Sequence, residues 1–278
     1  MDVPTIQGRS GLTLPAIGLG TYSLDGFDGT GSILEAIQLG YRLLDSAFNY
    51  ENEGAVGAGV RRCGLARHEL IVTSKLPGRH HRYEDAITTV EESVLRMGLD
   101  AIDIYLIHWP NPLEDHYVEA WRALIDARDR GLVKYIGVSN FLPEHIERLR
   151  KETGELPALN QIELHPYFPQ TEQLAYHREN SIITESWSPL GRGSDLLANS
   201  VIADIAAEHR VTPAQVLLAW HVHIGALPIP KSKSLERLRE NFDIFEISLT
   251  DNDIASIATL ARTDGRLAGQ DPSVYQEF

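Results

Sequence analysis

Eight short apolar runs recur along this chain, and they limit its fold more than any other feature. Each run is rich in Ile, Val, Leu and Tyr, as is typical of parallel strands that are buried on both faces. They cover residues 17–22, 41–47, 70–76, 102–109, 133–138, 158–164, 182–187 and 226–229. Between them lie amphipathic stretches with apolar residues three and four positions apart, such as 86–97, 117–130 and 143–151. The alternation predicts a series of βα units.

The regular spacing of these runs favours a closed barrel. Polar residues at the ends of four successive runs, Asp45, Lys75, His108 and Ser139, are separated by roughly 30 residues each. No linker or composition shift interrupts residues 1–278, and α/β barrels of about 250 residues commonly form one domain. We therefore predict a single-domain (β/α)8 TIM barrel over 1–278, with an open doubly wound sheet as the alternative. Two short segments at 5–6 and 12–14, separated by Gly and Ser, predict a small N-terminal β-hairpin.

Charge and cysteine content narrow the possible partners. The 25 Lys and Arg residues and 39 Asp and Glu residues give a formal net charge of -14. Such a balance disfavours nucleic acid and anionic membranes as general partners. Cys63 is the only cysteine, which excludes an intrachain disulfide and a cysteine-based metal cluster. Without a recognisable signal peptide or an apolar run of about 18 residues, we expect a cytoplasmic protein that does not span a membrane.

Polar or ionisable residues follow nearly all of the apolar runs. The main ones are Asp45, Lys75, His108, Ser139, Asn140, Gln161, Trp187 and Lys231. In (β/α)8 barrels the active site lies at the carboxyl ends of the strands. Burying Asp45 and Lys75 without partners would cost several kcal/mol. We therefore expect these side chains to converge and pair at one mouth of the barrel.

Several short motifs occur in a fixed order along the chain. They lie at residues 44–53, Lys75, 107–110, 136–140, 160–163, 188–191 and 229–232. Together they resemble the aldo-keto reductase family over essentially the whole chain, and within it the bacterial 2,5-diketo-D-gluconate reductase type. The resemblance implies a barrel with NADPH bound across its mouth. It also implies reduction of aldehyde or ketone carbonyls to alcohols by hydride transfer.

The same resemblance implies a catalytic tetrad of Asp45, Tyr50, Lys75 and His108. Hydride attack builds negative charge on the carbonyl oxygen, so a proton donor is needed there. Tyrosine has an ordinary pKa of about 10, and we expect the ammonium of Lys75 to lower the pKa of Tyr50. Asp45 would hold Lys75 charged and in place. His108, as a neutral imidazole, would donate to the carbonyl oxygen and orient the substrate.

A site for NADPH or NADP⁺ is implied as well. Its expected residues are Thr21, Tyr22, Asp45, Ser139, Asn140, Gln161, Trp187, Ser188, Leu190, Gly191, Lys231, Ser232, Arg237, Glu240 and Asn241. Trp187 would stack on the nicotinamide ring. Basic residues concentrate after the last run, where such barrels often bind phosphate. Lys231 and Arg237 would there hold the 2′-phosphate, so we predict a preference for NADPH over NADH.

The substrate side of the mouth is less well defined by sequence. The residues expected to line it are Tyr22, Phe48, Asn49, His108 and Trp109. Pro77 stands where many family members carry Trp, which predicts a wider pocket, and Glu51 adds a carboxylate next to Tyr50. The tail after Arg262 is short. We expect an open site for small aldehydes, α-dicarbonyls or keto-sugars.

Two other classes of function compete with this interpretation. One is an NADP-binding redox sensor or auxiliary subunit with little turnover, which would not need Tyr50 and Lys75 together. The other is a metal-dependent hydrolase using His108 and His165, but too few ligands follow the runs, and we expect no metal. We expect His80-His81 and His221/His223 to be surface histidines. A monomer is what the family resemblance implies.

Overall fold

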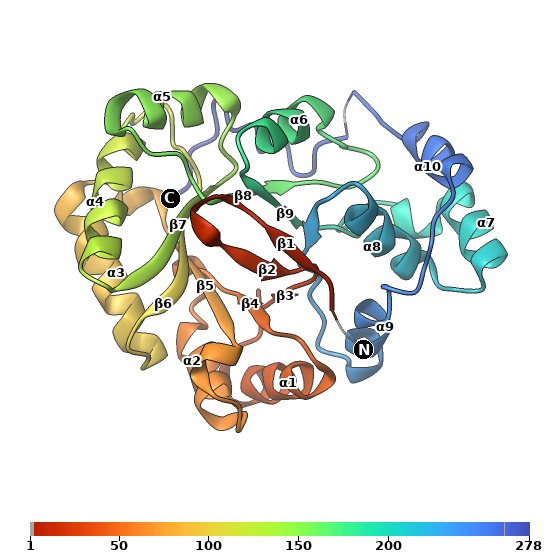
Figure 1. The fold of residues 1–278 in the computed structure, drawn as a ribbon, viewed down its shortest axis with the longest axis horizontal. Coiled ribbons are helices and arrows are strands. Elements are labelled where there is room, and N and C mark those ends of the chain that lie inside the picture. The colour runs from red at the N-terminus through yellow and green to blue at the C-terminus, as the bar shows by residue number, and fades with distance from the viewer. Residues whose placement is uncertain (1–2, 264) are drawn as a thin grey trace.

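Eight parallel strands with helices around them form the centre of the computed structural model, which describes residues 3–263 and 265–278 (Figure 1). The strands are β3 (Leu19–Gly20), β4 (Leu43–Asp45), β5 (Ile71–Leu76), β6 (Ile102–Ile107), β7 (Val133–Ser139), β8 (Leu159–Glu163), β9 (Ile183–Trp187) and β10 (Leu227–Pro228). Each predicted apolar run coincides with one of these strands, and β7 extends one residue beyond its run. The predicted α/β barrel is thereby confirmed.

The strands follow one another around the sheet in chain order, from β3 to β10. Backbone hydrogen bonds also link the first strand to the last: the N–H of Gly18 donates to Pro228 at 3.0 Å, and that of Gly20 to Pro230 at 3.1 Å. Only glycine allows this approach, because a Cβ on Gly20 would lie 2.8 Å from the carbonyl oxygen of Ile229. The sheet therefore closes, and the open-sheet alternative is wrong.

Helices surround the sheet. They are α1 (Gly26–Leu39), α2 (Glu53–Arg62), α3 (Tyr83–Met97), α4 (Tyr117–Asp129), α5 (Pro143–Thr153), α6 (Thr171–Glu179), α7 (Ser200–His209), α8 (Pro213–His223), α9 (Leu235–Phe242) and α10 (Asp251–Ala258). One helix per strand holds as far as β8, but two follow β9 and two follow β10. Helix α7 ends at Arg210, which has a left-handed φ of 58°. Thr212 and Pro213 then start α8 with a capping box.

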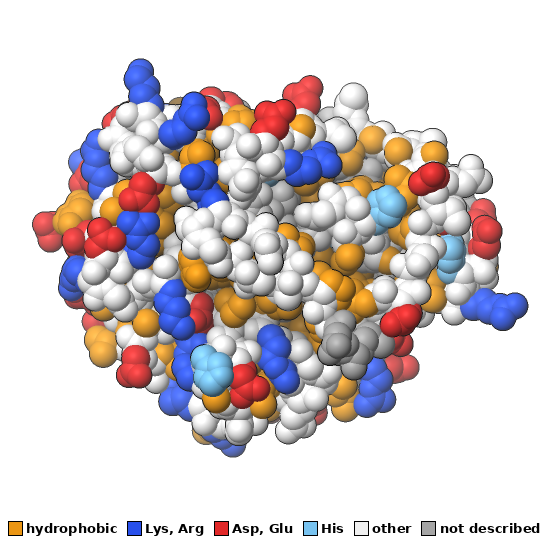
Figure 2. Space-filling view, viewed as in Figure 1, with side chains coloured by type: hydrophobic (Ala, Val, Ile, Leu, Met, Phe, Trp, Pro, Cys, Tyr) orange, Lys and Arg blue, Asp and Glu red, His pale blue; other side chains and the backbone are white. Residues whose placement is uncertain are grey.

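The predicted N-terminal hairpin is present and covers the amino-terminal end of the barrel. Its strands β1 (Thr5–Gln7) and β2 (Thr13–Pro15) pair antiparallel, and Leu12 and Leu14 are buried in a cluster with strand residues such as Leu43 and Ile183. Figure 2 shows this face, with charged side chains gathered mainly around the helical rim. Because the hairpin covers this end, the opposite mouth is left for the site.

Two histidines that we expected on the surface are buried. In α8, the ring nitrogens of His221 lie 2.7 Å from the carbonyl oxygen of Leu217 and 2.9 Å from that of Leu164. Burial lowers the pKa of His221 to about 4, and that of His81 to about 4 as well. The helical repeat of α8 places His221 on its inner face, which local polarity did not reveal.

In the described part of the chain, no helix is long and apolar enough to cross a membrane.

Candidate active site

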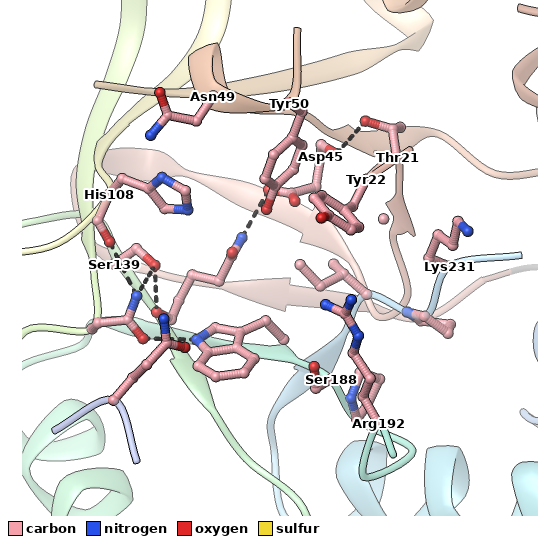
Figure 3. Close-up of a pocket in the computed structure, with 18 of the residues that line it drawn as sticks. Thr21, Tyr22, Asp45, Asn49, Tyr50, His108, Ser139, Ser188, Arg192 and Lys231 are labelled. Atoms are coloured by element: carbon pink, nitrogen blue, oxygen red, sulfur yellow. Dashed lines mark hydrogen bonds between the residues drawn. The ribbon is translucent and has the colours of Figure 1, made fainter. Parts of the chain in front are cut away.

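A cleft of about 570 Å³ opens at the carboxyl ends of the strands. It brings together most of the residues singled out from sequence: Thr21, Tyr22, Asp45, Asn49, Tyr50, His108, Trp109, Ser139, Asn140, Gln161, Trp187, Ser188, Leu190 and Lys231. Figure 3 shows Tyr50 and His108 on one side of the cleft and Arg192 and Lys231 on the other. The strand ends converge as predicted, because parallel strands of a closed sheet all end at the same mouth.

An ion pair between Asp45 and Lys75 lies beneath the cleft. Lys75 is fully buried, and its Nζ donates to Asp45 at 2.7 and 2.8 Å and to the carbonyl oxygen of Ser46 at 2.7 Å. Burial favours the neutral amine, but the neighbouring Asp45 outweighs it and holds the pKa of Lys75 above its ordinary value. Lys75 is therefore an ammonium ion whose three N–H groups all have acceptors.

Tyr50 stands beside this pair on the short 3-10 turn after β4. The Nζ of Lys75 lies 4.9 Å from the centroid of its ring, and the rings of Tyr22 and His108 meet it edge-on at 5.2 and 5.9 Å. Desolvation in the cleft raises the pKa of Tyr50 above its ordinary value, and Asp45 adds to this, while Lys75 opposes it. The net lowering expected from sequence is therefore wrong. The phenol keeps its proton at neutral pH, as an acid must.

His108 directly follows β6 and contacts a residue that the sequence did not single out. Its Nδ1 lies 2.6 Å from Oε1 of Glu277 at the end of the chain. The ring of Tyr275 packs on that of Trp109, with centroids 4.4 Å apart. The tail thus covers one side of the mouth although it is short, and the open site stays a prediction. No spacing signal could have found Glu277, because only the path of the tail brings it here.

A second group of polar residues forms the floor of the cleft. Asn140 donates to the carbonyl oxygen of His108 and to Ser139 Oγ, both at 3.0 Å, and accepts from Trp187 Nε1 at 2.7 Å. Gln161 Nε2 donates to Asp45 at 2.8 Å. These bonds fix the indole against the Asn140 amide and hold the Gln161 amide against Asp45. An aromatic face beside fixed amides suits a flat ring that carries a carboxamide.

Glu185 in β9 is a buried acid that the sequence did not reveal as part of the site. It accepts from Gln161 Nε2 at 3.0 Å, and the same nitrogen donates to Asp45. Burial and the nearby Asp45 raise the pKa of Glu185 from 4.5 to about 7, against the opposing effects of Gln161 and Lys75. The carboxyl therefore holds its proton in the folded protein at a pH where it would lose it on unfolding.

We expect Glu185→Gln to raise the free energy of unfolding at pH 8 by about 2–3 kcal/mol and to change it little at pH 5. Wild-type stability should fall as pH rises from 4.5 to about 7, because the folded state binds the proton more tightly than the unfolded state. Glutamine cannot ionise and keeps the bond to Gln161. Urea unfolding at both pH values measures this, with the exposed Glu208→Gln as control. Equal effects at pH 5 and pH 8 would contradict it.

Cations gather at the other end of the cleft. Lys231 lies there with Arg192, whose guanidinium is 5.2 Å from the centroid of the Tyr22 ring. Partial burial lowers the pKa of Lys231, and repulsion from Lys233 and Arg192 lowers it further, with Asp25 opposing. Two cations at the same end of the cleft fit an anionic group such as a phosphate. Sequence reasoning missed Arg192, although it directly follows the Gly191 loop.

Other expected site residues do not line the cleft. These are Phe48, Gly191, Ser232, Arg237, Glu240 and Asn241. Phe48 instead packs against Arg79 and Arg96, whose guanidinium carbons lie 5.2 and 4.4 Å from its ring centroid. Glu240 accepts a hydrogen bond from Thr212 at the start of α8. Glu51 adds no group to the cleft either, because its side chain is exposed.

Comparison with known proteins agrees with this arrangement. The sequence profile of the Aldo/keto reductase family matches residues 16–262. The chain belongs to this family. The matched region holds every strand of the barrel and the whole of the Asp45, Tyr50, Lys75 and His108 group. The resemblance predicted from the sequence motifs is therefore confirmed.

Relatives of this aldo/keto reductase are similar over almost their whole length. The 2,5-diketo-D-gluconic acid reductase B of a Corynebacterium species is 49% identical over 100% of this chain and 99% of its own. Methylglyoxal reductase DkgA of Escherichia coli is 40% identical over 99% of each. A Gox0644 variant solved in complex with NADPH has a TM-score of 0.94 and 40% identity, covering 99% of this chain and 100% of its own.

Proposed function

We propose that this protein is an NADPH-dependent oxidoreductase that reduces small aldehydes, α-dicarbonyls or keto-sugars to alcohols, with Tyr50 as the general acid. The observation that carries the proposal is the position of Tyr50, whose ring centroid lies 4.9 Å from Lys75 Nζ in the buried Asp45–Lys75 pair, at the mouth of a closed barrel. The relatives named for diketogluconate and methylglyoxal reduction support the reaction class.

The chain's own residues could hold the cofactor at both ends of the cleft. Trp187 and the fixed amides of Asn140 and Gln161 suit the nicotinamide end, and Lys231 and Arg192 suit the phosphates. When bound, NADPH supplies the hydride. Ser188 and Leu190, which the sequence also indicated for this site, line the cleft as well.

Tyr50 and His108 would act on the carbonyl oxygen. Their ring centroids lie 5.9 Å apart, and both side chains line the cleft. As charge develops on that oxygen, the phenol proton of Tyr50 moves to it and yields the alcohol. The ammonium of Lys75 then stabilises the phenolate that remains. Asp45 keeps that ammonium charged and fixed.

We further propose that residues 1–278 act as one barrel domain and as a monomer in the cytoplasm, with a small carbonyl compound and no nucleic acid as partner. The formal net charge of -14 supports the exclusion of nucleic acid. Light scattering of the purified protein tests the monomer, and a mass near twice 31.0 kDa would contradict it.

NADPH oxidation followed at 340 nm with a panel of aldehydes, α-dicarbonyls and keto-sugars tests the activity directly. We expect turnover with several members of the panel. Cofactor binding is measured in parallel by quenching of tryptophan fluorescence. Tight binding without turnover on any carbonyl would support the sensor or auxiliary role instead. Absence of binding would overturn the cofactor assignment of Trp187 and Lys231.

We expect kcat/KM to be at least tenfold higher with NADPH than with NADH, because only NADPH carries the 2′-phosphate. Lys231→Ala should lower the NADPH value about 10- to 100-fold and leave the NADH value nearly unchanged, as expected for a charge-assisted hydrogen bond. Lys151→Ala, on the exposed side of α5, is the matched control. Equal kcat/KM with the two cofactors in the wild type would contradict the prediction.

A further inference from the structure

The side chain of Glu277 enters the substrate side of the cleft from the end of the chain. Its Oε1 accepts from Asn49 Nδ2 at 2.8 Å and lies 2.6 Å from His108 Nδ1. Its Oε2 accepts from the backbone N–H of Gly78 at 2.8 Å. The residue is 9% exposed. The Glu277 carboxylate therefore already occupies the hydrogen-bond donors of Asn49 and Gly78. It does so next to His108, which would bind the substrate carbonyl.

The tail that carries Glu277 is held by its own set of contacts. Asn111 donates to the backbone carbonyl of Glu277 at 2.8 Å and accepts from its backbone N–H at 2.9 Å. A Cβ on Gly78 would lie 2.6 Å from that same carbonyl oxygen, so glycine is required for the close approach. Tyr275 packs on Trp109 two residues earlier. These contacts make the carboxylate a fixed part of the cleft wall.

Glu277 is ionised at neutral pH. Burial opposes ionisation, but His108 and the hydrogen bonds from Gly78 and Asn49 lower the pKa of Glu277 below its ordinary value. A substrate carboxylate in this part of the cleft would need the same donors and would find them taken. It would also meet a like charge in a place shielded from water, where repulsion is strong.

We propose that Glu277 is a specificity-determining residue that favours uncharged carbonyl substrates and disfavours those that carry a carboxylate. This inference rests on the proposed reductase function and narrows its substrate class. An uncharged aldehyde has no charge for Glu277 to repel, and the carboxylate contacts Nδ1 of His108, Asn49 and Gly78. The discrimination therefore acts on substrate charge and leaves the chemical step to the other residues.

Two matched substrate pairs test the proposal: 4-carboxybenzaldehyde with 4-formylbenzamide, and the corresponding 3-substituted pair. Members of a pair differ in charge but little in size. We expect the wild type to prefer the amide at least tenfold in kcat/KM. Glu277→Gln removes the charge and keeps one acceptor oxygen for either Gly78 or Asn49. It should lower the amide-to-acid ratio of kcat/KM about tenfold. Glu208→Gln removes one charge from the exposed side of α7 and should leave this ratio unchanged.

Several outcomes would overturn the proposal. One is a wild type that treats acid and amide alike, a result that needs no variant. Another is a Glu277→Gln variant that changes kcat/KM for all substrates by the same factor. Such a uniform change would indicate a structural role only. Glu277→Ala provides a second variant if the glutamine substitution disturbs folding by circular dichroism. A wild type that reduces none of the aldehydes with NADPH would instead contradict the reductase function itself.

Discussion

Replacing Tyr50 by Phe should lower kcat about 100- to 10,000-fold for every carbonyl substrate and leave the Kd for NADPH within about twofold. The substitution removes one hydroxyl and keeps the ring that meets Tyr22 and His108 edge-on. Because only the proton donor is lost, the cleft keeps its shape. Steady-state assays at 340 nm measure the loss, and fluorescence titration measures the cofactor affinity.

Tyr22→Phe is the matched control for this experiment. Tyr22 lines the same cleft and lies 5.2 Å from Tyr50, ring centroid to ring centroid, but its side chain is 47% exposed. We expect it to retain most of the activity. If Tyr50→Phe kept more than a tenth of the wild-type kcat, or if both variants lost activity equally, Tyr50 would not be the acid.

The second large effect should come from Lys75→Met, which we expect to lower the free energy of unfolding by about 3–5 kcal/mol. The variant leaves Asp45 buried with its main cationic partner removed. Asp45→Asn combined with Lys75→Met removes both charges together. The double variant should therefore recover much of the lost stability, since a neutral pair needs no compensating charge. Urea unfolding at pH 7 measures all three proteins.

Activity separates the two roles of this ion pair. Both the single and the double variant should be inactive, because neither has an ammonium beside the phenol of Tyr50. Stability that returns without activity would assign Lys75 to the chemistry as well as to the fold. A double variant as unstable as Lys75→Met would show that the contacts of Lys75, such as the one to Ser46, matter more than its charge.

Several features of this protein follow from local sequence alone. Apolar runs of strand length, separated by amphipathic stretches, leave the chain few alternatives to βα units, since each run can be buried only between helices. Polar residues at the ends of those runs, Asp45, Lys75 and His108 among them, must then meet at one mouth. For that reason the barrel and the residues at its mouth can be predicted from the sequence.

The path of the chain in space decided the rest. Glu277 reaches His108 only because Asn111 and Gly78 hold the tail against the mouth, and Glu185 meets Gln161 only through the pairing of β8 with β9. The direction of the Tyr50 pKa depends on how far the cleft excludes water, which no motif encodes. Sequence determined which groups stand at the strand ends, because that order is local. Tertiary structure alone decided their charges and their distant neighbours, because burial and long-range contacts exist only in the folded chain.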